Sequence, residues 1–405
     1  MMLTKEEEKI LDGEYGFYMQ KAMRILVALG DIYGAERLIP IRRAHIAGAS
    51  YITCGDAGLS FLEELSKEGN AHFNAETTLN PVSMVEEGEE LNIPINIVQK
   101  QQQICDAYLR IGAIPTYTCI PHFIGFAPIY GEHVAMSESS VVIWVNSMIG
   151  ARTNREGGIS ALAAAIIGKT PEYGFHLNDR RKASVLIINN AKLKDVSDYS
   201  AFGYHVGMTV IDKTPAIMRI KDVGISELKS MLTAMAVPGA VSLAHIIGLT
   251  PEARSVEDAF QGEKPEDKIS VEDSDIDKVY EKFNVANPSE VDCVYLGCPH
   301  LTLAELRKVC SLLKGKKVKK GVKMLIAVPK AVKHLAYETG LYQELTRSGA
   351  QVISSVCEVT LPLKDLGIEN LATNSAKCAH YSQSLFGVKP LLKSTEECIK
   401  IATGG

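Results

Sequence analysis

The sequence predicts an α/β protein with several lobes built on parallel sheets. A length of 405 residues is enough for two or three structural units, and 46% hydrophobic with 22% charged residues is typical of globular chains. The 32 glycines indicate many tight turns, as in α/β proteins whose sites are built from loops. The strongest evidence is a regular alternation of strand-like and helix-like segments after residue 288.

The predicted C-terminal lobe, residues 289–405, contains three apolar strands separated by two amphipathic helices. The strands read VDCVYLG, KMLIAV and QVISSV, and the helices read TLAELRKVCSLLK and KAVKHLAYETG. Thr302 and Glu305 form the capping-box pattern that begins the first helix. This alternation predicts a parallel βαβαβ sheet with right-handed crossovers.

The predicted N-terminal region, residues 1–288, is less regular. A helix capped by Thr4 begins the chain, and further helices are expected over residues 23–34, 99–113 and from about Ile159. Apolar runs at residues 93–98 and 139–145 predict strands. Residues 251–288 are dense in charge and predict a surface connection that ends this region.

Composition excludes several classes of protein. The formal net charge of -5 and the 6% aromatic content argue against a nucleic-acid-binding protein. The most apolar windows are shorter than the ~18 to 20 residues of a membrane-spanning helix, and the first residues are acidic, unlike an export signal. We therefore expect a cytoplasmic protein whose nine cysteines are reduced thiols.

Three cysteines are candidates to meet at one site, and two of them, Cys119 and Cys298, lie close to a proline. Cys298 follows the first strand of the C-terminal lobe and Cys357 follows the third, so both are expected at the carboxyl edge of one sheet. Cys119, in YTCIPHF, has a comparable context. If the three converge, their thiolates fit an iron–sulfur cluster or zinc. Their spacing equally allows scattered structural thiols, with His122 and His300 as structural histidines or as donors beside the ligands.

Two cationic segments are candidates for binding an anion. Lys377 falls in the first turn of a predicted helix, where a cation opposes the helix dipole unless an anion lies between them. It can equally reach outward to water. The loop at residues 152–155 carries Arg152 and Arg155 just before a predicted helix.

Six separated blocks of sequence resemble the large subunit of the aconitase X family. They are HIAGASYITCGDAG, NAETTLNPVSM, the stretch from YTCIPHF to NREGG, LGCPH, SSVCEV and TNSAKCAHY. The resemblance implies an aconitase-like multi-lobed fold and a hydro-lyase that removes water from a hydroxy acid. It also implies a 4Fe-4S cluster with one open iron, held by Cys119, Cys298 and Cys357. The substrate-binding residues it implies are Gly48, Ala49, Ser50, Asn80, Pro81, Glu138, Ser139 and Lys377.

Within the family the chain resembles the archaeal branch, which implies dehydration of (R)-5-phosphomevalonate to trans-anhydromevalonate 5-phosphate in the mevalonate route to isoprenoids. The open iron would act as a Lewis acid on the leaving hydroxyl. Fused members of the hydroxyproline branch are longer than this chain, so a separate small subunit is expected to carry the swivelling domain and the base. No catalytic residue of this chain is therefore singled out.

Two other functions compete with this one. The first is a subunit of a dehydratase acting on cis-3-hydroxy-L-proline or another hydroxy acid. The second is a non-catalytic scaffold subunit whose thiols bind zinc. A dinucleotide-binding enzyme is disfavoured, because no glycine fingerprint follows VDCVYLG.

Overall fold

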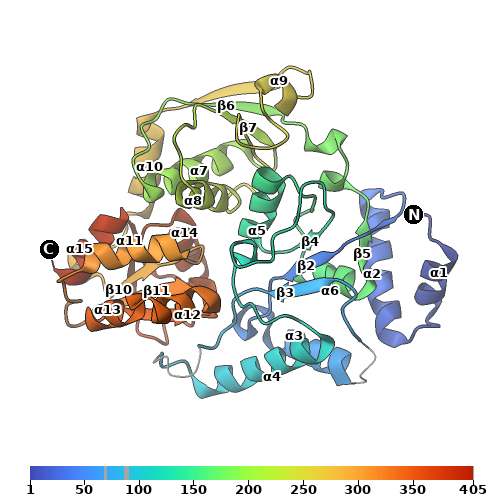
Figure 1. Cartoon of the computed structure of the whole chain (residues 1–405), viewed down its shortest axis with the longest axis horizontal. Coiled ribbons are helices and arrows are strands. Elements are labelled where there is room, and N and C mark those ends of the chain that lie inside the picture. Colours follow the sequence, from blue (N-terminus) through green and yellow to red (C-terminus); the bar gives the residue numbers. More distant parts are fainter. Residues whose placement is uncertain (68–70, 86–90, 405) are drawn as a thin grey trace.

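The computed structural model describes residues 1–67, 71–85 and 91–404. This part of the chain contains four β-sheets with helices packed on them, grouped into lobes around the short helix α5 (Ser139–Trp144) (Figure 1). Residue 405, the last of the predicted C-terminal lobe, lies outside the described residues.

The N-terminal lobe is built on a parallel three-stranded sheet. Its strand order is β3-β2-β4, with β2 (Arg43–Ile46) paired to both β3 (Glu76–Leu79) and β4 (Ala135–Met136). A second, antiparallel pair joins β1 (Leu38–Pro40) to β5 (Lys169–Pro171). The helices of this lobe are α1 (Lys5–Asp12), α2 (Phe17–Tyr33), α3 (Tyr51–Lys67), α4 (Ile95–Ile111) and α6 (Gly158–Ile167). Thr4 caps α1 through a capping box, as predicted.

The middle lobe carries a parallel four-stranded sheet in the order β8-β7-β6-β9. The strands are β6 (Val185–Asn189), β7 (Pro215–Met218), β8 (His245–Ile246) and β9 (Asp267–Val271). The helices are α7 (Val196–Val210), α8 (Ile225–Met235), α9 (Val256–Ala259) and α10 (Asp273–Phe283). Helices α7 and α8 touch closely at Gly203, where an added Cβ would lie 2.0 Å from the carbonyl oxygen of Met231.

The C-terminal lobe is a parallel five-stranded sheet in the order β12-β11-β10-β13-β14. Its strands are β10 (Cys293–Leu296), β11 (Lys323–Val328), β12 (Gln351–Ser354), β13 (Asn370–Thr373) and β14 (Lys389–Leu392). Its helices are α11 (Leu303–Leu313), α12 (Lys330–Glu338), α13 (Leu341–Arg347), α14 (Ala376–Phe386) and α15 (Thr395–Thr403). The predicted βαβαβ unit is confirmed, and so is the capping box of Thr302 and Glu305.

Two predicted strands are wrong, because both segments are helical. Residues 93–98 lead into α4, with Pro94 at the N-cap position. Residues 139–145 form α5 and the beginning of a π-helical turn over Val145–Ile149. All six residues of α5 are buried, so its sequence lacks the alternation of polar and apolar faces that would distinguish a helix from a buried strand.

The charged stretch at residues 251–288 is more than a connection. It supplies β9, which pairs with β6, and α10, whose Val279 and Phe283 are buried in the core. The first four residues of β9 are partly or fully exposed, which accounts for their polar composition at the edge of a sheet. The division of the chain at residue 288 stays a prediction.

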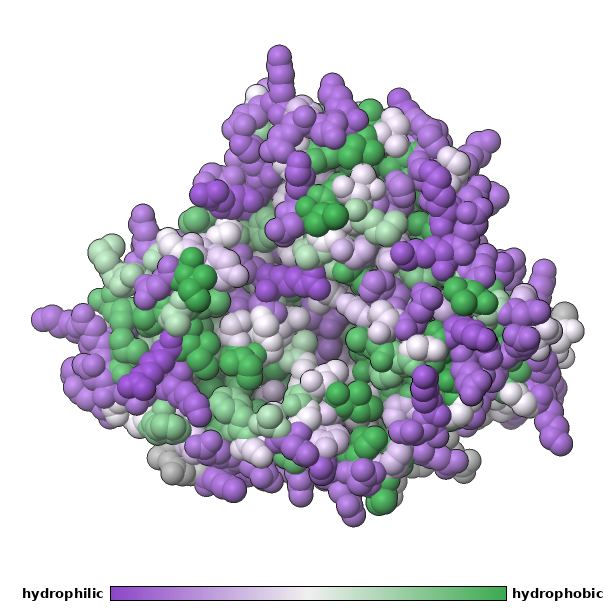
Figure 2. All heavy atoms as spheres, turned by 180° about the vertical axis from the view of Figure 1, so that it is seen from behind, coloured by the Kyte–Doolittle hydropathy of each residue, from purple (hydrophilic) through white to green (hydrophobic). Residues whose placement is uncertain are grey.

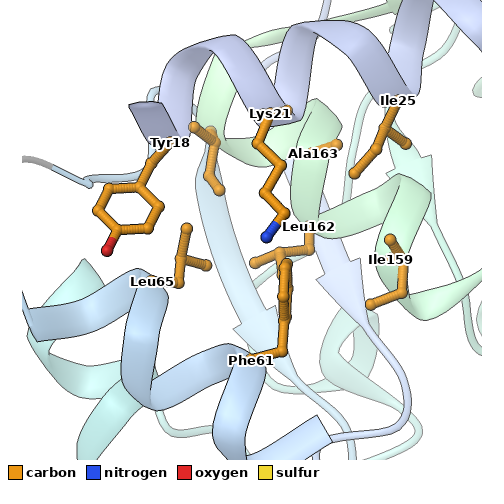
Figure 3. A pocket seen from close by; sticks show the side chains of 10 residues that line it. Tyr18, Lys21, Ile25, Phe61, Leu65, Ile159, Leu162 and Ala163 are labelled. Atoms are coloured by element: carbon orange, nitrogen blue, oxygen red, sulfur yellow. The ribbon is translucent and has the colours of Figure 1, made fainter. Parts of the chain in front are cut away.

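The surface is polar over most of its rim, while apolar side chains gather toward the middle of the face seen in Figure 2. A small hollow between α2, α3 and α6 is lined by apolar side chains, among them Leu65 and Ile159 (Figure 3). The amino group of Lys21 lies over the rings of Phe17 and Phe61, 5.2 and 5.1 Å from their centres. This hollow is a gap in the helix packing, and no predicted site residue lines it. Within the described residues, no helix has the length and apolar content to cross a membrane.

The contact at Gly203 predicts a loss of stability when a methyl group is added. Gly203→Ala must push α7 and α8 apart, so the free energy of unfolding should fall by about 1–3 kcal/mol in urea titrations. Met208→Ala, on an exposed position of the same helix, should change it by no more than ~0.5 kcal/mol. Equal effects of the two substitutions would show that the close approach is not a constraint on packing.

Candidate active site

The carboxyl edge of the N-terminal sheet carries the three predicted substrate segments. Residues 47–50 follow β2, residues 80–81 follow β3, and residues 137–139 follow β4. The three strands are parallel neighbours, so these loops all leave the same edge of the sheet. Open α/β sheets bind ligands at this edge.

The carboxyl edge of the C-terminal sheet carries two of the predicted cysteines and the predicted lysine. Cys298 follows β10, and Cys357 follows β12 in the same sheet. Lys377 lies in the first turn of α14, directly after β13. Gly297 permits the turn before Cys298, because its φ is +124° and an added Cβ would lie 2.4 Å from the carbonyl oxygen of Ala327.

These two edges meet. The Nζ atom of Lys377 lies 2.6 Å from Oε1 of Glu138 and donates to Oγ of Ser139 at 3.2 Å. Between the same two lobes, the backbone N–H of Val82 donates to the carbonyl oxygen of Ser355 at 2.7 Å. The structure therefore brings the predicted substrate loops and the cysteine loops to one junction.

Both members of the Glu138–Lys377 pair are charged. Burial alone would raise the pKa of Glu138, but the charge and hydrogen bond of Lys377 outweigh it, and the pKa falls to about 2. Burial alone would lower the pKa of Lys377, yet Glu138 holds it above its usual value. Lys377 is only 7% exposed, so it does not reach outward to water.

A chain of hydrogen bonds continues from Glu138 into the N-terminal sheet. Asn80 Nδ2 donates to Glu138 Oε2 at 3.0 Å, and Asn80 Oδ1 lies 3.3 Å from Nε2 of His45. The other ring nitrogen of His45 lies 2.8 Å from Oγ1 of Thr78. Burial lowers the pKa of His45 to about 4, so the imidazole is neutral at pH 7.

The loop at residues 48–50 is held by buried polar side chains. Gly48 adopts a φ of +79°, with open space where a Cβ would stand. The carbonyl oxygen of Ala49 accepts a hydrogen bond from Gln101 Nε2 at 2.9 Å, and the hydroxyls of Ser50 and Ser83 are hydrogen-bonded to each other. Pro81 is buried in the adjacent loop. The loop backbone is fixed before any ligand binds.

The third cysteine joins the other two from the N-terminal lobe. Ser140 Oγ lies 3.2 Å from the carbonyl oxygen of Cys119 and 3.1 Å from Glu138 Oε1, so its single proton lies between these two acceptors. Cys298 Sγ donates to Oε1 of Glu358 at 2.8 Å. All three thiols are buried.

The three cysteine thiols are a set of donors that fits a group of metal cations. Burial, and next the carboxylate of Glu138, raises the pKa of Cys119 to about 12. Burial and Glu358 likewise raise the pKa of Cys298 and of Cys357. Binding of metal cations would displace these thiol protons. The second oxygen of Glu358 is also buried without a hydrogen-bond partner.

Among the described residues, no group of three or more His, Cys, Asp or Glu side chains could hold one metal ion. The thiolates of an iron–sulfur cluster bind different iron atoms, so they do not have to gather about one point. Ligands of a cluster can therefore lie further apart than the ligands of a single zinc ion.

Some expectations differ from the structure, and some residues of the site were not predicted. Arg152 donates to the carbonyl oxygen of His176 at 3.1 Å, and Arg155 to that of Ala236 at 2.9 Å. The arginine loop thus ties the N-terminal lobe to neighbouring segments. His45 and Glu358 were missed, although each stands within or beside a block that carried the resemblance.

Comparison with models of protein families identifies the family of the chain. Models of the first, second and third domains of aconitase X match residues 1–179, 183–281 and 291–404. The chain belongs to the aconitase X family, which confirms the resemblance and the expected fold class.

Individual relatives cover the whole chain. The phosphomevalonate dehydratase large subunit of Thermococcus kodakarensis is 43% identical over 99% of this chain and 100% of its own length. The protein of the same name from Methanosarcina mazei is 43% identical over 100% of this chain and 98% of its own. The cis-3-hydroxy-L-proline dehydratase of Pseudomonas aeruginosa is 32% identical over 98% of this chain and 69% of its own.

A solved structure agrees with the fold. The crystal structure of Thermococcus kodakaraensis aconitase X in its holo-form matches with a TM-score of 0.92 and 43% identity. The match extends over 99% of this chain and 100% of the chain in that crystal structure.

The buried ion pair predicts strong coupling between its two members. Lys377→Met leaves a buried carboxylate without its counter-ion, so the free energy of unfolding should fall by about 3–5 kcal/mol. Adding Glu138→Gln should recover most of this loss, as measured by urea unfolding of the single and double variants. Lys278→Met removes the exposed partner of Asp275 and serves as the control, with an expected change within ~0.5 kcal/mol. Additive effects of the two substitutions would contradict the coupling.

The low pKa of Glu138 predicts a specific pH dependence. The carboxyl titrates at about 2 in the folded chain and at its usual 4.5 when unfolded, so its ionised form adds stability above pH 4.5. This contribution, about 3 kcal/mol, should disappear as the pH falls from 4.5 to 2. The difference in unfolding free energy between wild type and Glu138→Gln should shrink over that range. If the difference in unfolding free energy between the two proteins stays constant down to pH 2, the low pKa of Glu138 is refuted.

Proposed function

We propose that this chain is the large subunit of a phosphomevalonate dehydratase, a hydro-lyase that converts (R)-5-phosphomevalonate to trans-anhydromevalonate 5-phosphate. The observation that carries the proposal is the junction of the two sheet edges, where three buried thiols lie beside a buried cation. The relatives support the choice of substrate, since identity is 43% to two proteins named phosphomevalonate dehydratase large subunit and 32% to a cis-3-hydroxy-L-proline dehydratase.

Cys119, Cys298 and Cys357 would hold the iron–sulfur cluster of this enzyme, in the 4Fe-4S form with one open iron. When bound, such a cluster supplies a Lewis acid for the hydroxyl oxygen that leaves the substrate. The reaction breaks one C–O bond and one adjacent C–H bond, and it releases one water molecule.

Lys377 is placed to orient the substrate. An ammonium group has three N–H donors, and two of them point to Glu138 and Ser139. The third is available for an anionic group of the substrate, either its carboxylate or its phosphate. Glu138 keeps Lys377 charged, and Asn80 keeps Glu138 in place through its amide.

Among the described residues that surround Lys377, neither Glu138 nor His45 is a good base for the proton. Glu138 has a pKa of about 2 and is already paired, so it is a weak base at pH 7. His45 is buried, and its two ring nitrogens lie against Thr78 and Asn80. This supports a partner that brings the base, namely a small subunit with the swivelling domain. The name "large subunit" of the relatives agrees with such a partner.

Anaerobic co-purification with the small subunit tests the proposal. The complex should contain iron with matching acid-labile sulfide, absorb visible light, and dehydrate (R)-5-phosphomevalonate but not cis-3-hydroxy-L-proline. The large subunit alone should be inactive. Stoichiometric zinc with no turnover would favour the scaffold function, and turnover of the hydroxyproline alone would favour the other branch.

Single serine replacements test the ligand set in the same preparation. Cys119→Ser, Cys298→Ser and Cys357→Ser should each lose most of the iron and the activity. Cys310→Ser is the matched control, because this buried thiol lies on α11 and donates to Glu344 at 3.2 Å. Iron content in Cys310→Ser should equal that of the wild type. Full iron retention in any of the first three variants would remove that residue from the ligand set.

A further inference from the structure

His300 touches the loops of all three predicted cluster cysteines. It stands in the loop of Cys298, two residues further along the chain. Its backbone N–H donates to Sγ of Cys119 at 3.4 Å. Its ring nitrogen Nε2 lies 2.8 Å from the carbonyl oxygen of Val356, the residue before Cys357.

The second ring nitrogen of His300 also has a protein partner. Nδ1 of His300 lies 3.0 Å from Oγ1 of Thr118, the residue before Cys119. A carbonyl oxygen only accepts, so Nε2 carries the proton and donates to Val356. Nδ1 of the neutral ring then accepts from the hydroxyl of Thr118, which itself accepts from the N–H of Ile120 at 3.3 Å.

The backbone carbonyl oxygen of His300 also accepts a hydrogen bond. Nζ of Lys229, on α8, donates to it at 2.8 Å and forms an ion pair with Glu305 at 2.6 Å. The side chain of Lys229 is only 3% exposed. This contact anchors the cysteine loop to the middle lobe, so all three lobes meet at one residue.

We infer that His300 is the positioning residue that holds the loops of Cys119, Cys298 and Cys357 in register for the cluster. Both ring nitrogens are occupied by protein partners, so His300 is neither a ligand nor a proton carrier in this arrangement. The inference rests on the proposed function for the identity of the cluster, but the hydrogen bonds themselves belong to the metal-free chain. Residues that orient metal ligands typically change metal affinity by about 10- to 100-fold when they are replaced.

Thiol alkylation of the metal-free chain tests the inference without any cluster. Rates of reaction with N-ethylmaleimide would be measured for each of the nine cysteines by peptide mass spectrometry. His300→Asn keeps an acceptor near the position of Nδ1 but loses the donor to Val356, so Cys357 should react at least tenfold faster. His300→Gln keeps a donor near Nε2 but loses the acceptor for Thr118. The alkylation rate of Cys119 should therefore be the one that rises.

Two further variants serve as controls. Thr118→Val removes only the hydroxyl. It should raise the alkylation rate of Cys119 and leave the rate of Cys357 unchanged. His245 is an equally buried histidine whose Nε2 lies 2.6 Å from the carbonyl oxygen of Arg181 in the middle lobe. His245→Asn should leave the rates of Cys119, Cys298 and Cys357 unchanged, even where it lowers overall stability.

The loaded protein supplies an independent readout. His300→Asn should lose iron to a chelator at least tenfold faster than wild type, with an altered electron paramagnetic resonance signal of the cluster, while His245→Asn should match wild type. Unchanged cysteine rates in both His300 variants, or an equal rise at all nine cysteines, would overturn the inference. If the wild type binds no cluster, the proposed function fails, and the alkylation pattern still decides the role of His300.

Discussion

The ion pair between Glu138 and Lys377 is the interaction on which the site depends. Its two residues are 239 positions apart in sequence and belong to different sheets. A buried charge without a partner is costly, so each residue requires the other, and the two carboxyl edges are held face to face. Asn80 and Ser140 attach the loops after β3 and β4 to the same carboxylate. The pair therefore links substrate recognition to the packing of the lobes.

The cysteine loops depend on the same junction. Ser140 bridges Glu138 and the carbonyl oxygen of Cys119, so the first thiol is fixed by the residue that neutralises Lys377. His300 then connects that loop to the other two. Polar groups that must all be satisfied within a buried volume favour one arrangement over others. The proposed metal ligands and the proposed substrate-binding residues thus lie in one hydrogen-bonded network.

The sequence predicts the C-terminal lobe well, because its strands are short apolar runs between capped amphipathic helices. It fails at residues 139–145, where a helix buried on all sides carries no periodicity, and at residues 93–98, where Pro94 precedes the first turn of α4. Strand ends and a helix N-terminus singled out Cys298, Cys357 and Lys377, and the resemblance to a family supplied their roles together with that of Cys119. His300 was expected as a structural histidine or as a donor beside the ligands, and His45 was assigned no role, because the segments that contact them are distant in sequence. Spacing along a chain does not encode which loops meet.

One consequence of a site shared by the first and last lobes concerns the timing of biosynthesis. A ribosome that adds ~5–20 residues per second needs roughly 10 to 50 seconds to travel from Cys119 to Cys357. For most of that interval His300 has not been translated, and Lys377 is translated only after Cys357. If the proposed cluster is held by Cys119, Cys298 and Cys357, delivery of iron and sulfide is a step that follows translation of nearly the whole polypeptide.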